Sequence, residues 1–115
     1  MEVTFLQWKC QAVFGKYRNG RIAIQLVAAG DASGDVEVMC GEPIATATVN
    51  VDRIALEADE VLIKDYAENE GMSDALVAAG LVQPLLKVIH IGGFQAQCAI
   101  GRLTPTALQA AGLAH

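Results

Sequence analysis

The sequence predicts a single α+β domain covering residues 1–115, built on a mainly antiparallel, twisted sheet of five or six strands. One long helix is expected to pack on this sheet, and a short helix is expected at the C-terminal end. Three observations predict this fold class. A helical period is confined to Ile63–Val82, strand patterns lie on both sides of it, and 115 residues is the usual length of one domain with a real core.

The long helix is predicted from apolar residues at helical spacing, namely Met72, Ala75, Leu76 and Ala79. Asn69 or Ser73 is expected to cap its N-terminus, because a short polar side chain accepts a hydrogen bond from an unpaired amide. Gly71 is expected in a tight turn before the helix, since glycine inside a helix costs about 1 kcal/mol relative to alanine. Gly80 follows the last periodic residue and predicts the end of the helix.

Four strands are expected before the helix, at Glu2–Phe14, Arg21–Ala29, Ile44–Val51 and Val61–Lys64. The pair Asn19–Gly20 predicts a tight hairpin turn between the first two strands, with positive φ at both residues. Gly30–Gly34 is expected to be a polar loop, and Asp35–Cys40 a short strand that extends the hairpin.

Two strands are expected after the helix, at Leu81–His90 and Phe94–Leu103, with a hairpin turn at Gly92–Gly93. Pro84 cannot donate a hydrogen bond to a neighbouring strand, so it indicates an edge position or the start of a strand. Thr104 and Pro105 predict the capped first turn of the short C-terminal helix.

The net charge of −5 and the pI near 4.8 argue against tight, general binding to duplex nucleic acid, which needs a positive surface. A small anionic ligand is still compatible, because it needs only a few Arg or Lys groups. No apolar run approaches the roughly 18 residues of a membrane span, and no N-terminal signal segment is present. The chain is therefore expected to be soluble and cytoplasmic.

No catalytic constellation or cofactor motif is found, and the chain is predicted to be neither an enzyme nor a metal protein. The sequence has an odd number of cysteines, and they are widely spaced, at Cys10, Cys40 and Cys98. This pattern indicates buried, reduced thiols. The histidines are His90 and His115, too few for a zinc site. Several basic residues lie at expected strand ends or turns, where they could converge on one anionic group: Arg18, Arg21, Arg53, Lys64 and Arg102.

Four segments in this order resemble one group of small phage and plasmid proteins with an uncharacterised domain: YRNGRIAIQLV, GEPIATATVN, IKDYAENEGMSDALVAAGLV and GGFQAQCAIGRL. The resemblance runs from about Tyr17 to Arg102. Related to this group are the anti-Thoeris sponge proteins, which bind a cyclic ADP-ribose isomer made by a bacterial immune TIR enzyme. They hold this signal intact, form oligomers, and bind the ligand in a pocket near a subunit interface.

The resemblance implies a homo-oligomeric counter-defence protein that sequesters a cyclic nucleotide in the cytoplasm of an infected bacterial host. Its ligand carries a pyrophosphate, two riboses and an adenine. Arg21 and Arg102 are the matching positions for phosphate binding. Phe94 is the position for stacking on the base. Asn69 and Tyr66 are expected to make polar contacts.

A competing interpretation is an acidic protein–protein inhibitor of a bacterial defence complex, of the anti-CRISPR type. An acidic surface can block a basic groove of a partner. Eight acidic residues fall in one region of the sequence and could form such a face: Asp52, Glu57, Asp59, Glu60, Asp65, Glu68, Glu70 and Asp74. A small accessory phage protein without inhibitory activity is the third interpretation.

Overall fold

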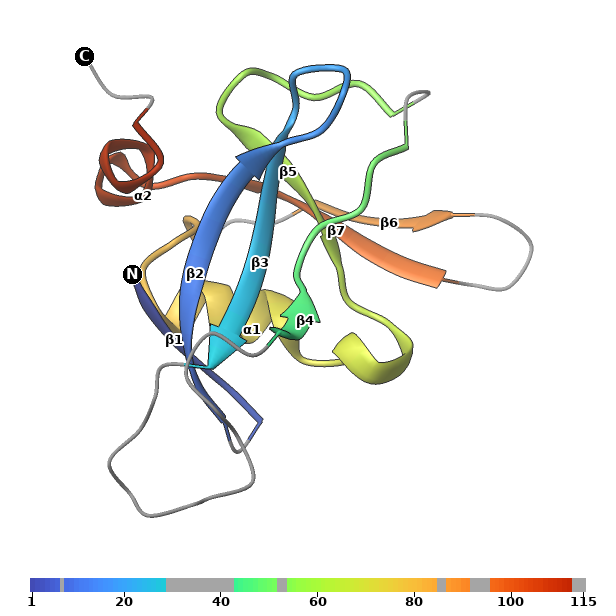
Figure 1. Ribbon diagram of the computed structural model, residues 1–115. Coiled ribbons are helices and arrows are strands. Elements are labelled where there is room, and N and C mark those ends of the chain that lie inside the picture. Colours follow the sequence, from blue (N-terminus) through green and yellow to red (C-terminus); the bar gives the residue numbers. More distant parts are fainter. Residues whose placement is uncertain (7, 29–42, 52–53, 85–86, 92–95, 113–115) are drawn as a thin grey trace.

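The computed structural model describes residues 1–6, 8–28, 43–51, 54–84, 87–91 and 96–112. Within these ranges, seven strands form two antiparallel sheets of four and three strands, and two short α-helices accompany them (Figure 1). The α+β class is therefore confirmed, whereas the prediction of one sheet with five or six strands is wrong. The loop expected at 30–34 and the strand expected at 35–40 lie outside the described residues.

The first sheet has the strand order β1-β2-β3-β4, and each pair of neighbours is antiparallel. Its strands are β1 (Glu2–Phe5), β2 (Trp8–Lys16), β3 (Ile22–Ala28) and β4 (Pro43–Thr46). Side chains of a strand point to alternate faces, and one face of β3 is buried at Ile22, Ile24, Leu26 and Ala28. This sheet thus has an inner, core-facing side and an outer side.

A tight turn divides the segment that was expected to form a single first strand. Phe5 at the end of β1 pairs directly with Trp8 at the start of β2, and Leu6 between them has a φ of 56°. Leucine rarely adopts a positive φ, and no Gly, Pro or Asn marks this turn. The buried side chains consequently change parity, from Val3 in β1 to Cys10 in β2.

The predicted hairpin joins β2 to β3, but through a longer loop than expected. The amide of Tyr17 donates to the carbonyl of Arg21 at 2.8 Å, so residues 17–21 form the connection. Gly20 has a φ of 86°, whereas Asn19 is not among the described residues with positive φ. The two-residue turn expected at these positions is therefore wrong.

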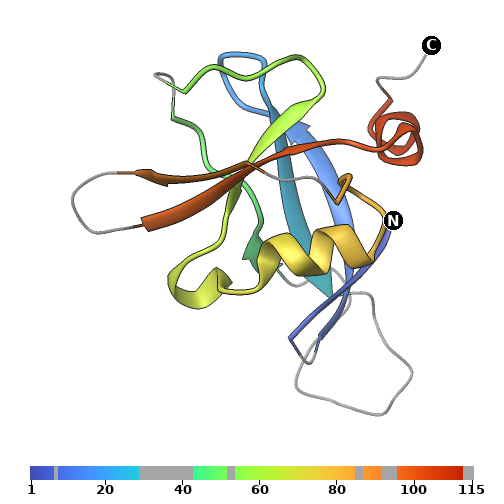
Figure 2. The ribbon, with the colours of Figure 1, turned by 180° about the vertical axis from the view of Figure 1, so that it is seen from behind.

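The second sheet has the order β5-β7-β6, formed by β5 (Glu60–Lys64), β6 (Lys87–Ile91) and β7 (Ala96–Arg102). β6 and β7 reach away from the rest of the molecule as a two-stranded extension (Figures 1 and 2). Ahead of β6, Val82 makes an isolated bridge to Leu103, and Pro84 precedes the strand. The turn predicted at 92–93 lies outside the described residues.

The helical region is shorter than predicted, and the expectation of one long helix is wrong. A 3-10 helix, η1 (Ala67–Asn69), is followed by α1 (Met72–Ala78), which has only seven residues. Gly71 caps α1 in the left-handed region, with a φ of 95°, so the helix cannot extend backwards through it. Gly80, with a φ of 78°, ends the helix as predicted.

The predicted C-terminal helix is confirmed as α2 (Pro105–Ala110). The Thr104 hydroxyl accepts a hydrogen bond from the amide of Ala107 at 3.1 Å, which is the expected cap. Neither α1 nor α2, nor any other helix in the ranges given above, is long and apolar enough to cross a bilayer.

The segment between β4 and β5 links the two sheets through main-chain hydrogen bonds. The amide of Ala47 donates to Ile24 in β3 at 2.8 Å, and its carbonyl accepts from the amide of Lys64 in β5 at 2.8 Å. The buried Thr48 hydroxyl accepts from the amide of Ile24 at 3.1 Å and lies 2.8 Å from the hydroxyl of Tyr17. We call this segment, Ala47–Val49, the inter-sheet link.

The core lies between the inner side of the first sheet, β5 and α1. Seen from behind, α1 crosses this inner side below β5 (Figure 2). The largest fully buried apolar side chains include Ile24, Leu26, Leu62, Ile63, Met72, Leu76, Leu81 and Leu103. Aliphatic residues therefore form most of the core, as the low aromatic content requires.

Candidate binding site

Arg21 stands at the end of the loop between β2 and β3, where its guanidinium is bonded to the main chain. It donates to the carbonyl of Val51 at 2.8 Å and also to the carbonyl of Ile54. Its own amide donates to the side-chain oxygen of Asn19 at 3.2 Å. Arg21 therefore ties the hairpin loop to the segment that follows the inter-sheet link.

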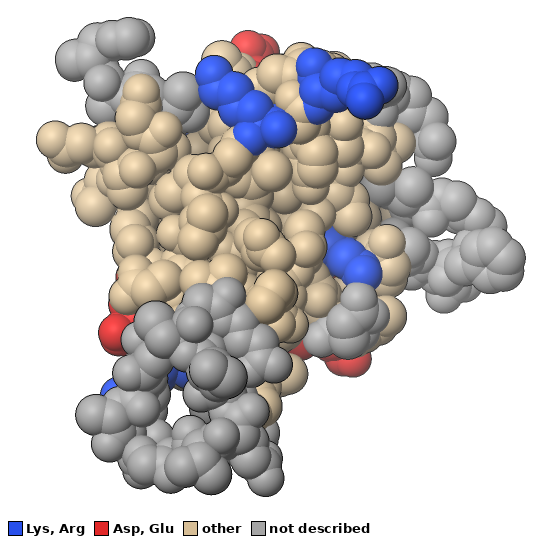
Figure 3. Space-filling model, viewed as in Figure 1, with Lys and Arg blue, Asp and Glu red and all other residues tan. Residues whose placement is uncertain are grey.

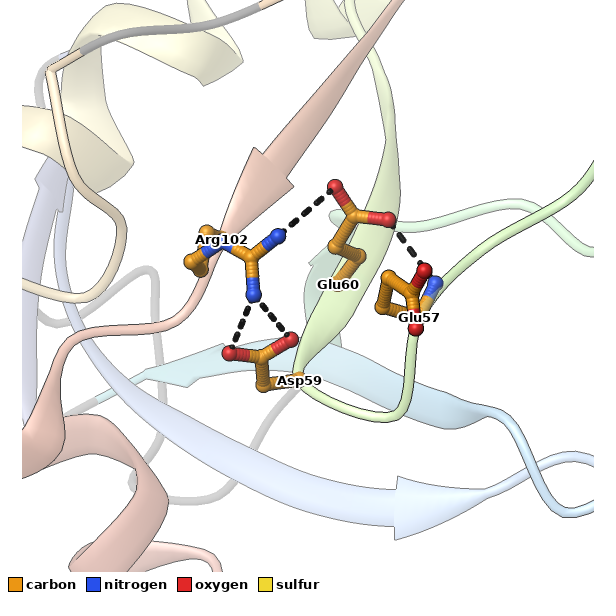
Figure 4. A network of polar contacts seen from close by, with 4 residues as sticks. All are labelled: Glu57, Asp59, Glu60 and Arg102. Atoms are coloured by element: carbon orange, nitrogen blue, oxygen red, sulfur yellow. Dashed lines mark hydrogen bonds and ion pairs between the residues drawn. The ribbon is translucent and has the colours of Figure 1, made fainter.

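Arg102 ends β7 and is held by carboxylates at the start of β5 (Figure 4). Its Nη1 lies 2.7 Å from both carboxylate oxygens of Asp59, and its Nη2 lies 3.6 Å from Glu60. The hydrogen bonds that Arg102 donates to Asp59, and then the nearby negative charges, raise the pKa of Arg102 above its ordinary value. Glu60 also accepts the amide of Glu57 at 2.8 Å, so these four residues form one network.

Tyr66 and Asn69 belong to the turn that precedes α1. The Asn69 side chain is buried, and it donates a 2.6 Å hydrogen bond to the carbonyl of Thr46 at the end of β4. The ring of Tyr66 is partly exposed, and the ammonium group of Lys64 lies 5.2 Å from its centre. Asn69 is thus occupied by a main-chain partner, while Tyr66 faces a cation of its own chain.

The five residues predicted for the nucleotide site fall into two groups in a single chain. Arg21 and Arg102 lie near Glu60, at the start of β5, whereas Tyr66 and Asn69 follow its end at Lys64. Four residue steps along a strand span about 13 Å. Phe94, the fifth residue, lies outside the described residues. The two groups are therefore set apart along β5, and the nucleotide site stays a prediction.

Each group has one member that lines an open hollow, Arg21 in the first and Tyr66 in the second. The first, which we call the hairpin hollow, has a volume of about 390 Å³ and is lined by Lys16, Asn19, Gly20, Arg21, Ile22, Leu56, Glu57, Ala58 and Glu60. Lys16 and Arg21 give it two positive charges, and Glu57 and Glu60 give it two negative ones. Its electrostatic character is therefore mixed, with cations on the hairpin and carboxylates on the segment that leads into β5.

The second hollow, which we call the helix-start hollow, has a volume of about 450 Å³. Its lining residues are Asp65, Tyr66, Ala67, Glu70, Gly71, Asp74 and Gln97. One oxygen of Asp65 accepts the amide of Gly71 at 2.8 Å, which fixes this carboxylate against the turn. Glu70 and Asp74 are exposed beside it. Three carboxylates and an aromatic ring thus surround a space that no described Lys or Arg lines.

The predicted acidic face is divided in the same way. Arg102 lies among Glu57, Asp59 and Glu60 and compensates one of their three negative charges. Asp65, Glu70 and Asp74 line the helix-start hollow. Asp52 lies outside the described residues, and so does the side chain of Glu68.

The described cysteine and serine side chains are buried. Cys10 and Cys98 are fully buried free thiols. Burial raises the pKa of both thiols, and the charge of Asp65 raises that of Cys98 further. The Ser73 hydroxyl is also buried and has no hydrogen-bond partner within the described part of the chain. Among the residues with assigned positions, no group of three His, Cys, Asp or Glu side chains is arranged to hold a metal ion.

Two contributors to the hollows were missed from the sequence. Lys16 was assigned to a turn, and Gln97 was treated only as part of an alternating strand. Gln97 could have been found from the strand pairing, because β7 runs beside β5 and brings Gln97 next to Asp65. Lys16 carries no such signal, since the other wall of the hollow, at Leu56, Glu57, Ala58 and Glu60, is at least 40 residues away in sequence.

A scan against models of protein families gives no match for this chain, and neither does a search of curated proteins or of solved structures. The resemblance to phage and plasmid proteins therefore stays a prediction.

Proposed function

We propose that this chain is a non-enzymatic protein that binds a basic surface of a partner protein at the helix-start hollow. The observation that carries the proposal is the set of carboxylates around this hollow, at Asp65, Glu70 and Asp74. Asp65 holds the turn through Gly71, so the exposed Glu70 and Asp74 are assigned to the partner.

The chemistry of the hollow suits arginine or lysine side chains of a partner. A guanidinium group binds a carboxylate through paired, charge-assisted hydrogen bonds. Complementary charge also speeds the encounter of two proteins and selects against acidic partners. The net charge of −5 adds to the attraction at long range. Binding of this kind should weaken as salt concentration rises.

The competing interpretation of the sequence, an acidic inhibitor of the anti-CRISPR type, supplies the biological setting of this proposal. The partner would then belong to a bacterial defence complex of the CRISPR type, in which a basic groove holds nucleic acid. An acidic protein seated on that groove would keep the nucleic acid out. Inhibition then needs no catalytic group, which agrees with the interpretation of this chain as a non-enzyme.

The test is phage plating on bacterial strains that each carry one defined defence system and express this chain. The chain is expected to restore plating in a strain with a CRISPR-type system. The double variant Glu70→Gln, Asp74→Asn should lose this effect. The control is Glu2→Gln, Glu57→Gln, which removes the same charge elsewhere and should keep it. Failure of the wild-type chain in every CRISPR-type strain, or full activity of the first double variant, would contradict the proposal.

Sequestration of a cyclic ADP-ribose isomer is the second candidate function, and the hairpin hollow favours it. Lys16 and Arg21 both line this hollow, and two cations suit a pyrophosphate. Arg21 is already oriented by two carbonyls, so little side-chain entropy is lost on binding. Glu57 and Glu60 on the same hollow oppose an anion, which is why this candidate ranks second.

Sequestration is tested by thermal denaturation against a panel of cyclic nucleotides, with mass spectrometry of what the heated protein releases. A ligand at a hundred times its dissociation constant adds about 2.7 kcal/mol of stability. Lys16→Ala should abolish this shift, whereas Lys9→Ala, at the other end of β2, should keep it. Intact ligand must be recovered. If no nucleotide in the panel shifts the midpoint, sequestration at this hollow is wrong.

A further inference from the structure

The outer edge of β6 carries main-chain groups that no other described segment pairs with. β6 ends the second sheet, in the order β5-β7-β6, and among the described strands only β7 pairs with it. β6 and β7 together reach away from the rest of the molecule (Figures 1 and 2), and Val88 in β6 is 53% exposed. An open strand edge is a template for another extended chain.

The hydrogen bonds around β7 show in which direction its main-chain groups point. The carbonyl of Gln97 accepts the amide of Asp65, which follows β5. The carbonyl of Arg102 accepts the amide of Gln83, which precedes β6. Because the direction alternates along a strand, alternate residues of β7 direct their groups to β5, as Gln97 does, or to β6, as Arg102 does.

The same alternation identifies the groups on the open edge of β6. Cys98 in β7 directs its groups to β6 and lies opposite Ile89, so these two residues form a hydrogen-bonded pair. Val88 and His90, on either side of Ile89, consequently direct their amides and carbonyls away from β7. Two residues along a strand span about 6.7 Å, and donors and acceptors repeated at this spacing match the backbone of another strand.

The other strand edges of the two sheets have neighbours in the described structure. β5 is bonded to the inter-sheet link on the side away from β7, and the carbonyl of Thr46 in β4 accepts the side-chain amide of Asn69. α1 lies beside β1, where Glu2, Thr4 and Ala79 line a small hollow between them. Among the described edges, that of β6 is the one left without such a neighbour.

Charge and position favour a basic chain at this edge. His90 pairs with Gln97, and Gln97 lines the helix-start hollow, so the β6 edge adjoins the acidic site. The net charge of −5 favours a basic chain over an acidic one and over a second copy. Figure 3 shows the middle of the first sheet as a broad area without Lys, Arg, Asp or Glu, so that side offers a basic chain no opposite charge.

We propose that a basic, extended segment of a partner protein adds to β6 as a fourth strand of the second sheet. The basic character of this segment rests on the proposed function, whereas its extended backbone follows from the β6 edge alone. The exposed Val88 favours a β-branched or aromatic side chain opposite it, because such cross-strand pairs stabilise a sheet. Main-chain hydrogen bonds supply the affinity of this binding mode, and side chains supply its selectivity.

The probe is a synthetic peptide of alternating valine and arginine, about seven residues long, which is within the usual length of a strand. It is added to the full chain, and amide hydrogen exchange is followed by NMR. At about ten times its dissociation constant, the peptide should slow exchange of the Val88 and His90 amides about tenfold. The amide of Thr4, in the edge strand β1, should not change. A peptide with glutamate in place of arginine should bind more weakly.

His90→Pro tests the edge directly. Proline removes an amide that points outward, whereas the bonds of Ile89 to β7 stay, so β6 should still form. The variant should bind the peptide at least about tenfold more weakly. The matched control is Thr4→Pro in β1, where the amide also points away from the neighbouring strand, and it should keep wild-type affinity. Circular dichroism confirms that both variants are folded.

A peptide that does not bind, or that binds without slowing exchange at Val88 and His90, would overturn the proposal. This measurement uses the wild-type chain, so it holds even if His90→Pro does not fold. Wild-type affinity of a folded His90→Pro, or an equal loss in Thr4→Pro, would also overturn it. Protection of these amides that rises with protein concentration without peptide would assign the edge to a second copy and overturn it as well.

The two proposals fail separately. The phage plating test examines the helix-start hollow through Glu70 and Asp74, which lie outside β6. If that test fails while the peptide still protects Val88 and His90, only the proposed function is wrong. If plating depends on Glu70 and Asp74 but the two amides are not protected, only the strand addition is wrong.

Discussion

The side-chain amide of Asn69 donates a 2.6 Å hydrogen bond to the carbonyl of Thr46, across 23 positions of sequence. This bond fixes the turn before α1 to the end of β4. The sequence predicted Asn69 as a helix cap or a ligand contact, but α1 begins after Gly71 with no side-chain cap. The helix-start hollow therefore depends on this buried amide for its position.

Replacing Asn69 with alanine should lower the free energy of unfolding by about 1–3 kcal/mol, because the hydrogen bond from the buried Asn69 amide to the carbonyl of Thr46 is lost. Urea unfolding measures the change. The control is Asn50→Ala, where an exposed side chain accepts a bond from the Asn19 side chain. That variant should stay within about 0.5 kcal/mol of wild type. Equal losses of unfolding free energy in the two variants would contradict a specific contribution of the Asn69 hydrogen bond to stability.

Gly71 and Gly15 form a matched pair for measuring backbone strain. A Cβ atom added at either position meets no atom within 4 Å, so only the backbone conformation differs. Gly71 has a φ of 95°, and Gly71→Ala should lower the free energy of unfolding by about 1–2 kcal/mol. Gly15→Ala in β2 should leave it unchanged or raise it by up to about 1 kcal/mol. Similar effects at both positions would contradict the left-handed turn.

Arg21 should behave as a structural residue in the absence of any ligand. Arg21→Ala removes the bonds to the carbonyls of Val51 and Ile54, and it should cost about 1.5–3 kcal/mol of stability. Arg18→Ala, at an exposed position of the same loop, should stay within about 0.5 kcal/mol. The unfolding free energies of the two variants are measured by chemical denaturation. If Arg21→Ala were as stable as wild type, the hydrogen bonds to Val51 and Ile54 would contribute nothing to stability, and Arg21 would not be a structural residue.

Stability should decrease at alkaline pH through the buried thiols. Burial raises the pKa of Cys10 above its ordinary value of 9.0, whereas the unfolded chain ionises near that value. Between the two, the folded chain holds a proton that the unfolded chain has released, so stability falls as pH rises through this window. Cys10→Ala should therefore lose less stability than wild type between about pH 8 and about pH 10. Parallel losses in both proteins would contradict the prediction.

Local signals in the sequence predicted the parts of the fold that depend on neighbouring residues. Gly80 and Thr104 both act as expected, because helix ends are determined by the residues next to them. The turn at Leu6 was missed because leucine carries no turn signal, and its positive φ is imposed by the pairing of β1 with β2. The helix was overestimated in length, although Gly71 before it and Gly80 after it were both predicted to bound it, because these two glycines leave room for only seven helical residues.

The candidate site was less predictable than the fold. Arg21 and Arg102 were singled out because cations are scarce, but each is bonded to a segment at least 30 positions away. Such partners follow from tertiary structure and leave no local pattern. The separation of the acidic residues into two groups likewise depends on the length of β5, which lies between them.

The inter-sheet link makes the two sheets thermodynamically inseparable. The carbonyl and amide of Ala47 bond to β5 and β3, so opening either sheet at this point breaks main-chain bonds on both sides. The Thr48 hydroxyl adds a buried bond that neither sheet could keep alone. Unfolding should consequently be a single cooperative transition, and the amides of Ala47 and Lys64 should exchange hydrogen only when the whole domain opens.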